Sequence, residues 1–230
     1  MVTIAPNPIN PRKTLIPPLR FAIVETSVYR GSYPRPLNFP FLESLRLKTI
    51  LSLTPTPPIE PVAEWCKQQG IKMIHYTPDK SGKKSIPLSH RDVKFAIEII
   101  LDSKNSPVYI HCLNGSEATG LVMACLRKLQ FWAAPCIFSE LQRFSELHNS
   151  FEAFLEGFVE EIEIPGQTVG WLWQKMKDAE GVIGRHRIGI RYKDRDLEGK
   201  RMRRLATEEE SSTVGVEVNG VGGGGEGDNR

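Results

Sequence analysis

One short segment of the chain combines a nucleophile with a loop that can hold an anion. The apolar run 108–110 predicts a buried strand, and it leads through His111 into Cys112. Gly115 permits a sharp backbone turn, and an apolar stretch over 121–129 predicts the helix that follows. Backbone N–H groups of such a loop converge with the positive end of the helix dipole. The same field stabilises a thiolate at Cys112, which could then attack a phosphorus atom and form a covalent thiophosphate.

The same residues also have a simpler interpretation. Cys112 would merely end a buried strand, and Gly115 would be an ordinary turn glycine. On the chemical interpretation, the hydroxyl of Thr119 would lie near the sulfur and stabilise it as the leaving group of a second step. The segment by itself leaves both interpretations open.

The elements around this segment alternate between strand and helix, which is typical of an α/β domain with a central sheet. Apolar periodicity and caps such as Ser89 before an amphipathic stretch define the helices. Strands are expected at 21–24, 28–30, 49–53, 71–76 and 108–110, and helices at 38–47, 61–70, 89–103, 121–129, 135–148 and 151–161.

Bulk composition places the chain among globular proteins. Of its 230 residues, 40% are hydrophobic and 25% are charged, and no apolar run approaches the roughly 20 residues of a membrane helix. The four cysteines have no metal-ligand spacing, so neither a metal nor a cofactor is expected, and we interpret them as reduced thiols. A cytoplasmic protein is therefore predicted, with the nucleus as an alternative and no membrane association.

Composition also divides the chain. Residues 185–204 hold nine basic and three acidic side chains, whereas 205–230 hold one and six. We interpret the basic segment as part of a solvated tail, with an acidic partner or a nuclear signal as the alternative. The remainder is nearly neutral, so nucleic-acid binding is not expected. The predicted organisation is a Pro-rich leader (1–18), a domain (19–165), a short helix or extension (166–180) and a disordered tail (181–230).

Several runs resemble one family, the plant-and-fungal atypical dual-specificity phosphatases of the cysteine-based protein tyrosine phosphatase superfamily. The chain looks closest to the divergent fungal paralogues. The resemblance implies the cysteine-phosphatase fold, with a central, mostly parallel sheet flanked by helices. The runs that carry it are 28–34, 38–42, 47–53, 107–112, 125–130 with Trp132, 137–138 and 142–144.

By this resemblance Cys112 corresponds to the nucleophile and Thr119 to the hydroxyl that follows the phosphate loop. The substrate-binding loop corresponds to Leu113, Asn114, Gly115, Ser116, Glu117 and Ala118. In the family the last of these positions is an arginine that clamps two phosphoryl oxygens, and here Ala118 takes its place. The family loop is also strongly basic, whereas this one carries an acid and no base.

Two questions follow from the altered loop. Glu117 would repel phosphate if its carboxylate faces the cradle, but it would be harmless as a solvated residue in the first turn of a helix. A base could also be supplied from elsewhere, and Lys80, Lys83 and Lys84 lie on a loop that borders the phosphate site in related folds. Asp79 on that loop is the candidate general acid, or else a turn former.

The sequence therefore predicts a phosphatase-like protein with a degenerate loop, weak or inactive, acting as a regulatory or binding subunit. Related phosphatase-family chains would be its partners. The alternative is an active phosphatase that works through a phosphocysteine at Cys112. The resemblance implies that its substrate would then be a phosphorylated protein, with phosphotyrosine as the target, or an inositol pyrophosphate.

Overall fold

The computed structural model describes residues 14–78, 86–146, 149–164, 168–172 and 188–192. Five strands form one sheet, in the order β1-β2-β5-β3-β4, and β6 pairs with β7 separately. The elements are β1 (Ala22–Glu25), β2 (Val28–Gly31), η1 (Pro36–Asn38), α1 (Phe39–Ser44), β3 (Thr49–Leu53), α2 (Glu60–Gln68), β4 (Lys72–Tyr76), α3 (His90–Leu101), η2 (Ser103–Asn105), β5 (Val108–His111), α4 (Glu117–Leu129), α5 (Ala134–Gln142), α6 (Asn149–Gly157), β6 (Glu161–Ile164) and β7 (Gly189–Tyr192).

The sheet confirms the predicted α/β architecture with mostly parallel strands. β5 lies at its centre and runs parallel to both β2 and β3, while β1 is antiparallel to β2. All residues of β5 are buried, as its continuous apolar run predicts. His111 ends this strand between Gly31 of β2 and Ser52 of β3. The loop after β5 therefore emerges at the carboxyl edge of the parallel strands, where open α/β sheets place their sites.

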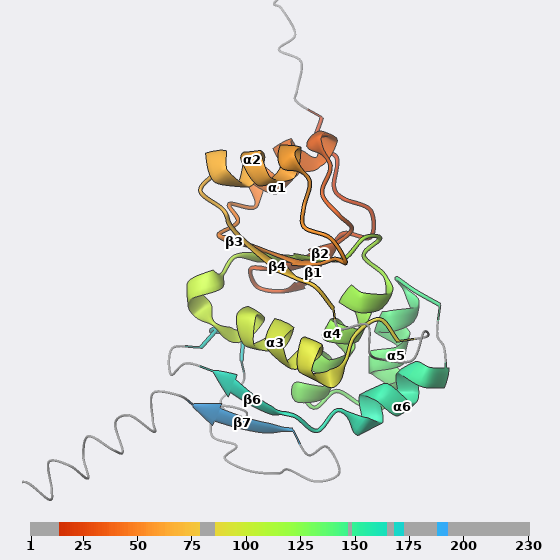
Figure 1. The fold of residues 1–230 in the computed structure, drawn as a ribbon. Coiled ribbons are helices and arrows are strands. Elements are labelled where there is room, and N and C mark those ends of the chain that lie inside the picture. The colour runs from red at the N-terminus through yellow and green to blue at the C-terminus, as the bar shows by residue number, and fades with distance from the viewer. Residues whose placement is uncertain (1–13, 79–85, 147–148, 165–167, 173–187, 193–230) are drawn as a thin grey trace, which may run out of the picture. The chain divides into compact units, whose positions relative to one another are not determined.

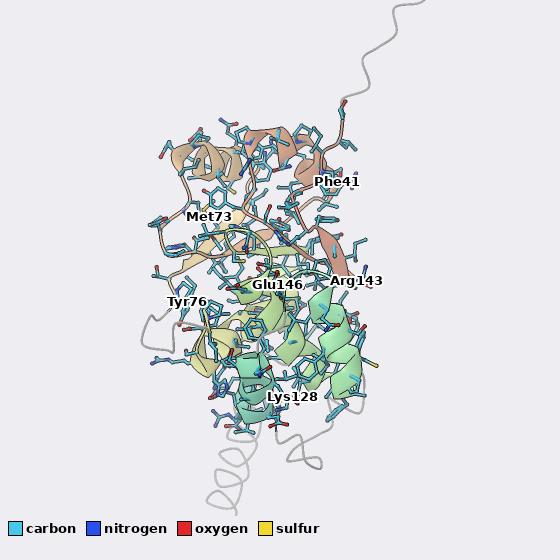
Figure 2. The ribbon with its side chains drawn as sticks, turned by 90° about the vertical axis from the view of Figure 1, so that its right-hand side faces the viewer. Phe41, Met73, Tyr76, Lys128, Arg143 and Glu146 are labelled. Carbon is cyan, nitrogen blue, oxygen red and sulfur yellow. The ribbon has the colours of Figure 1, made fainter. Side chains whose placement is uncertain are left out.

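Helices cover both faces of the sheet, as Figure 1 shows: α1 and α2 lie on one face, and α3 to α6 lie on the other. Figure 2 shows the same layers from the side, with Phe41 of α1 in one layer and Lys128 among the helices of the other. A cluster that includes Leu42, Ile50 and Trp65 fills the space under α1 and α2. Within the described residues, no helix is both long and apolar enough to cross a membrane.

The helix that follows the loop, α4, is buried on every side, from Ala118 to Leu129. It packs against α3, α5 and α6, so even its polar residues need partners. Lys128 finds them at the end of α6, where Nζ donates to the carbonyl oxygens of Leu155, Glu156 and Phe158. Sequence patterning placed the start of this helix at 121, whereas it begins at Glu117. The earlier start puts the loop's last residue, Ala118, inside the first helical turn.

The C-terminal elements differ from the sequence-based expectation in two places. The last predicted helix, 151–161, is shorter than expected: α6 ends at Gly157 and the chain continues into β6. The alternating sequence Glu-Ile-Glu-Ile at 161–164 explains the change, because a period of two suits a strand. β7 falls within the 181–230 stretch that was predicted to be tail, and the rest of that stretch lies outside the described residues.

Candidate active site

The loop between β5 and α4 is a tight turn that only glycine can make at its centre. Gly115 has φ +74°, and a Cβ built there would lie 2.6 Å from the carbonyl carbon of Gly31. Both the left-handed backbone and this contact exclude a side chain. The loop at Gly115 thus packs directly against the backbone of Gly31, at the end of β2.

Cys112 lies at the start of the loop with 5% of its surface exposed. Its Sγ donates a weak hydrogen bond to Oδ1 of Asn114, at 3.6 Å. Thr119 follows in the first turn of α4 and is fully buried. Among the described residues its hydroxyl has no hydrogen-bond partner. The structure therefore retains a thiol at the loop's start and a free hydroxyl at its end.

Asn114 is an exposed residue whose side-chain oxygen bonds to both Cys112 and Ser116. Its Oδ1 accepts hydrogen bonds from the backbone N–H of Ser116 at 3.1 Å and from the Ser116 hydroxyl at 2.8 Å, in addition to the Cys112 thiol. Ser116 is 5% exposed and immediately precedes α4. One of the loop's N–H donors is thus already used by a side chain of the loop itself.

Ala118 and Glu117, at the end of the loop, differ in their exposure to solvent. Ala118, which the resemblance aligns with an arginine, is buried and 7% exposed. Glu117 is exposed and begins α4, where an acid is favoured by the helix dipole. Of the two alternatives for Glu117, the structure supports the solvated residue of the first helical turn.

Two arginines contact the loop from outside, and residue patterning had singled out neither. Arg20 donates through Nη1 to the carbonyl oxygen of Asn114 at 3.1 Å, and its side chain is exposed. Arg30 donates through Nη2 to the carbonyl oxygen of Gly115 at 2.8 Å, and it is 1% exposed. The resemblance includes the run that holds Arg30, but nothing in a sequence shows that this side chain turns toward a loop 85 residues away.

Arg30 lies behind the loop, and peptide geometry shows why. The carbonyl of Gly115 and the N–H of Ser116 belong to one trans peptide, so they point in opposite directions. The N–H points at Asn114 Oδ1, on the side of the thiol. The guanidinium bonded to the carbonyl is therefore on the opposite side of that peptide from the thiol.

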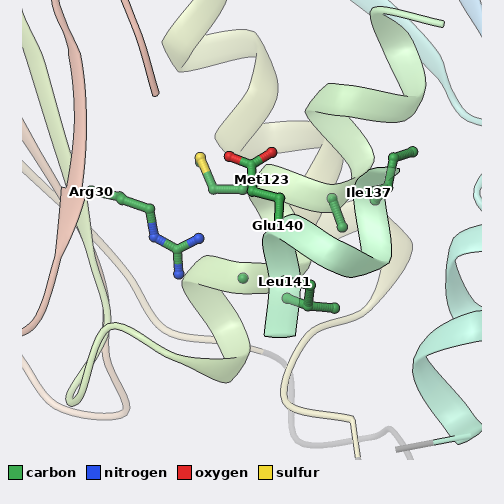
Figure 3. Close-up of a pocket in the computed structure, with 7 residues that line it drawn as sticks. Arg30, Met123, Ile137, Glu140 and Leu141 are labelled. Atoms are coloured by element: carbon green, nitrogen blue, oxygen red, sulfur yellow. The ribbon is translucent and has the colours of Figure 1, made fainter. Parts of the chain in front are cut away.

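The crevice around Arg30 is narrow, and its lining includes one acidic side chain, that of Glu140. Figure 3 shows its guanidinium pointing into a crevice next to Met123, Glu140 and Leu141, and this crevice has no room for a water molecule. The ring of Phe144 covers the guanidinium at 4.0 Å. Among the described residues, Nε and Nη1 have no hydrogen-bond partner. Burial lowers the pKa of Arg30 to about 10, and attraction to Glu140 and Cys112 offsets part of that shift.

His111 is a buried residue that hydrogen-bonds at the start of the loop. Its Nδ1 lies 3.2 Å from the carbonyl oxygen of Cys112, which can only accept, so Nδ1 carries the proton. Burial lowers the pKa of His111 to about 4, so the ring is neutral at physiological pH. His75 and His90 bond to backbone carbonyls elsewhere.

The remaining predicted site residues lie outside the described part of the chain. These are the candidate acid Asp79 and the candidate bases Lys80, Lys83 and Lys84. In the part of the chain that the structure describes, no group of three metal-ligating side chains gathers.

Comparison with known proteins decides the family. The profile of the tyrosine phosphatase family matches residues 15–177. The chain belongs to this family. The match includes the whole of the main sheet and the loop at Cys112, in agreement with the geometry.

Relatives in this family carry two kinds of name. The chain is 38% identical to the putative tyrosine-protein phosphatase OCA6 of Saccharomyces cerevisiae, over 66% of this chain and 74% of that one. It is 42% identical to the inositol diphosphatase DSP1 of Oryza sativa subsp. japonica, over 57% of this chain and 59% of the relative. It thus spans less than two thirds of the rice protein.

A solved structure of a family member supports the fold. The core catalytic domain of the PP-IP phosphatase SIW14 from S. cerevisiae, crystallised with citrate, matches this chain with a TM-score of 0.58 at 34% identity. The match covers 63% of this chain and 88% of that domain. The predicted cysteine-phosphatase fold and the resemblance to the atypical dual-specificity phosphatases are thereby confirmed.

Proposed function

We propose that this member of the tyrosine phosphatase family hydrolyses phosphate esters weakly or not at all, and that it acts as a binding or regulatory subunit. One observation carries the proposal: the buried methyl group of Ala118 stands where the phosphate-clamping arginine belongs. Arg30, the buried guanidinium that contacts the loop, bonds to the Gly115 carbonyl on its outer side.

The energetic consequence of the missing clamp is large. In other phosphoryl-transfer enzymes an arginine that stabilises the transition state contributes about 10³–10⁵ in rate. That factor corresponds to roughly 4–7 kcal/mol of transition-state stabilisation. The loop's remaining donors, namely backbone N–H groups and the Thr119 hydroxyl, are neutral and do not replace a bidentate guanidinium. A thiol at Cys112 can therefore persist without supporting rapid turnover.

The mouth of the loop favours a protein partner. Leu113, the first residue of a loop that by the resemblance would be basic in the family, is 60% exposed. Ile59 is 58% exposed and is joined to the same region by Tyr33, whose hydroxyl accepts from Ile59 N and whose N–H donates to Leu113 O. An apolar rim of this kind suits a protein surface. Related phosphatase-family chains are the partners we propose.

The alternative is an active phosphatase that uses Cys112. Its thiolate would attack phosphorus, the leaving oxygen would take a proton from an acid such as Asp79, and water would then release phosphate from the phosphocysteine. Arg20 is the observation that favours it, since its exposed guanidinium already lies 3.1 Å from the Asn114 carbonyl. The relatives' names point to two substrate classes for this case, phosphotyrosine and inositol pyrophosphates.

Phosphate release decides between the two. Wild type, Cys112→Ser and Ala118→Arg are compared on p-nitrophenyl phosphate, a phosphotyrosine peptide and an inositol pyrophosphate. We expect at most slight release above the Cys112→Ser background in wild type, and clearly more in Ala118→Arg. Robust wild-type release that disappears in Cys112→Ser would refute the proposal, and Arg20→Gln would then show whether Arg20 supplies the charge.

We also propose the cytoplasm as the compartment. All four cysteines are free thiols, which fits a reducing environment. Imaging of the full chain, with and without residues 181–230, checks this location and the role of the basic segment.

A further inference from the structure

We propose that Asn114 is an internal ligand of the phosphate loop: its side-chain oxygen fills an oxyanion position and keeps the loop closed to external anions. The proposal deepens the proposed function, because it rests on the same loop. It begins from three donors that converge on one atom. The backbone N–H and hydroxyl of Ser116 and the thiol of Cys112 all point to Oδ1 of Asn114.

The distances are those expected of a bound oxygen. Oδ1 lies 3.1 Å from the Ser116 nitrogen and 2.8 Å from its hydroxyl, within the normal range for hydrogen bonds. The sulfur lies 3.6 Å away. An oxygen of a substrate that Cys112 could attack must also lie close to both the sulfur and the loop's N–H groups. Asn114 Oδ1 therefore stands in the space that a substrate oxygen would need.

In the contact with sulfur the thiol is the donor, because a carboxamide oxygen can only accept. Asn114 Oδ1 thus accepts the hydrogen of the Cys112 thiol, as well as occupying space beside the sulfur.

Backbone contacts on both sides hold Asn114 in place. Arg20 donates to the Asn114 carbonyl, and Arg30 donates to the carbonyl of Gly115. One residue earlier, the Leu113 carbonyl accepts from the N–H of Tyr33. Three successive peptides of the loop are therefore anchored from outside.

A donor in the neighbouring helical turn stays unused. The Thr119 hydroxyl is fully buried, and it has no partner among the described residues. An oxyanion with an oxygen in reach of this hydroxyl would gain a hydrogen bond that the single oxygen of Asn114 does not make. The class of ligand is a tetrahedral oxyanion, and tungstate is a suitable probe because it needs no hydrolysis.

The experiment compares Asn114→Ala, which removes the oxygen, with Asn114→Asp, which keeps an acceptor there. Asn149→Ala on α6, at an exposed position, is the matched control. Tungstate binding is measured by calorimetry, and alkylation of Cys112 by iodoacetamide is followed by peptide mass spectrometry, which separates it from the exposed Cys136. We expect Asn114→Ala to bind tungstate about tenfold more tightly and to react about tenfold faster, the effect of about one net hydrogen bond. Asn114→Asp and Asn149→Ala should show neither gain.

Unchanged binding and alkylation in a folded Asn114→Ala protein would overturn the proposal, and Asn114 would then be an ordinary turn residue. Equal gains in Asn114→Asp would overturn it too, since the acceptor would not matter. Neither readout is activity, so the result is separable from that of the proposed function. A further outcome is that wild type proves to be an active phosphatase while Asn114→Ala still gains tungstate affinity. That result would support Asn114 as an internal ligand and refute the proposed weak or absent hydrolysis.

Discussion

Acid should destabilise this protein through one buried imidazole, and the effect can be worked out from the structure. His111 has a folded-state pKa of about 4, below its ordinary value of 6.5, mainly because the ring is fully buried. Its Nδ1 proton is used by the Cys112 carbonyl, and its Nε2 has no partner among the described residues. A second proton on Nε2 would therefore place a charge in a site with no acceptor for it.

The sign follows from proton binding in the two states. Between pH 6.5 and 4 the unfolded chain binds a proton at His111 and the folded chain does not. Stability is thus fully present above the unfolded pKa and is lost as the pH falls toward the folded pKa. Going from pH 7.5 to pH 4.5, the loss is about 2.5 kcal/mol in the free energy of unfolding.

Urea unfolding followed by tryptophan fluorescence provides the assay, with wild type and His111→Asn measured across this range. Asparagine can still donate to the Cys112 carbonyl but does not titrate. Carboxylates affect both proteins, so the quantity of interest is the difference between their unfolding free energies. That difference should shift by about 2.5 kcal/mol in favour of the variant at pH 4.5 relative to pH 7.5. A difference that stays constant with pH would refute the argument that the ring is held neutral by burial.

Three further predictions concern stability and use the same urea assay. Gly115→Ala should cost about 1–3 kcal/mol from the backbone at φ +74° alone, and more from the contact with Gly31; a cost near zero would contradict the closed loop. Lys128→Met should cost roughly 2–4 kcal/mol, because three carbonyl oxygens at the end of α6 lose their donor, and a loss below about 1 kcal/mol would mean that water reaches them. Ser89→Ala should cost about 1 kcal/mol, since the Ser89 hydroxyl accepts from the N–H of Asp92 at the start of α3, and an unchanged midpoint would show that this cap is dispensable.

Local sequence was sufficient for much of the fold. The apolar run that becomes β5 predicts a central buried strand, and Ser89 marks the start of α3 correctly. These features depend on neighbours in the chain, namely periodicity and caps, so they can be recognised without knowing the tertiary structure. The helix expected over 151–161 ends early at Gly157, and part of the reason is a contact that is not local in the sequence. Its last residues alternate as a strand, and pairing with β7 is a contact between segments far apart in the chain.

The chemical content of the site follows from residue type and spacing alone. A thiol at Cys112, a glycine at 115 and a methyl group at Ala118 can be read directly from the chain. How these groups are oriented depends on the folded structure around them. Glu117 faces solvent, Arg30 lies behind the loop, and Asn114 accepts three hydrogen bonds within it. Side-chain direction in a loop is set by the peptides and helices that pack around it, and those contacts come from segments that are distant in the sequence.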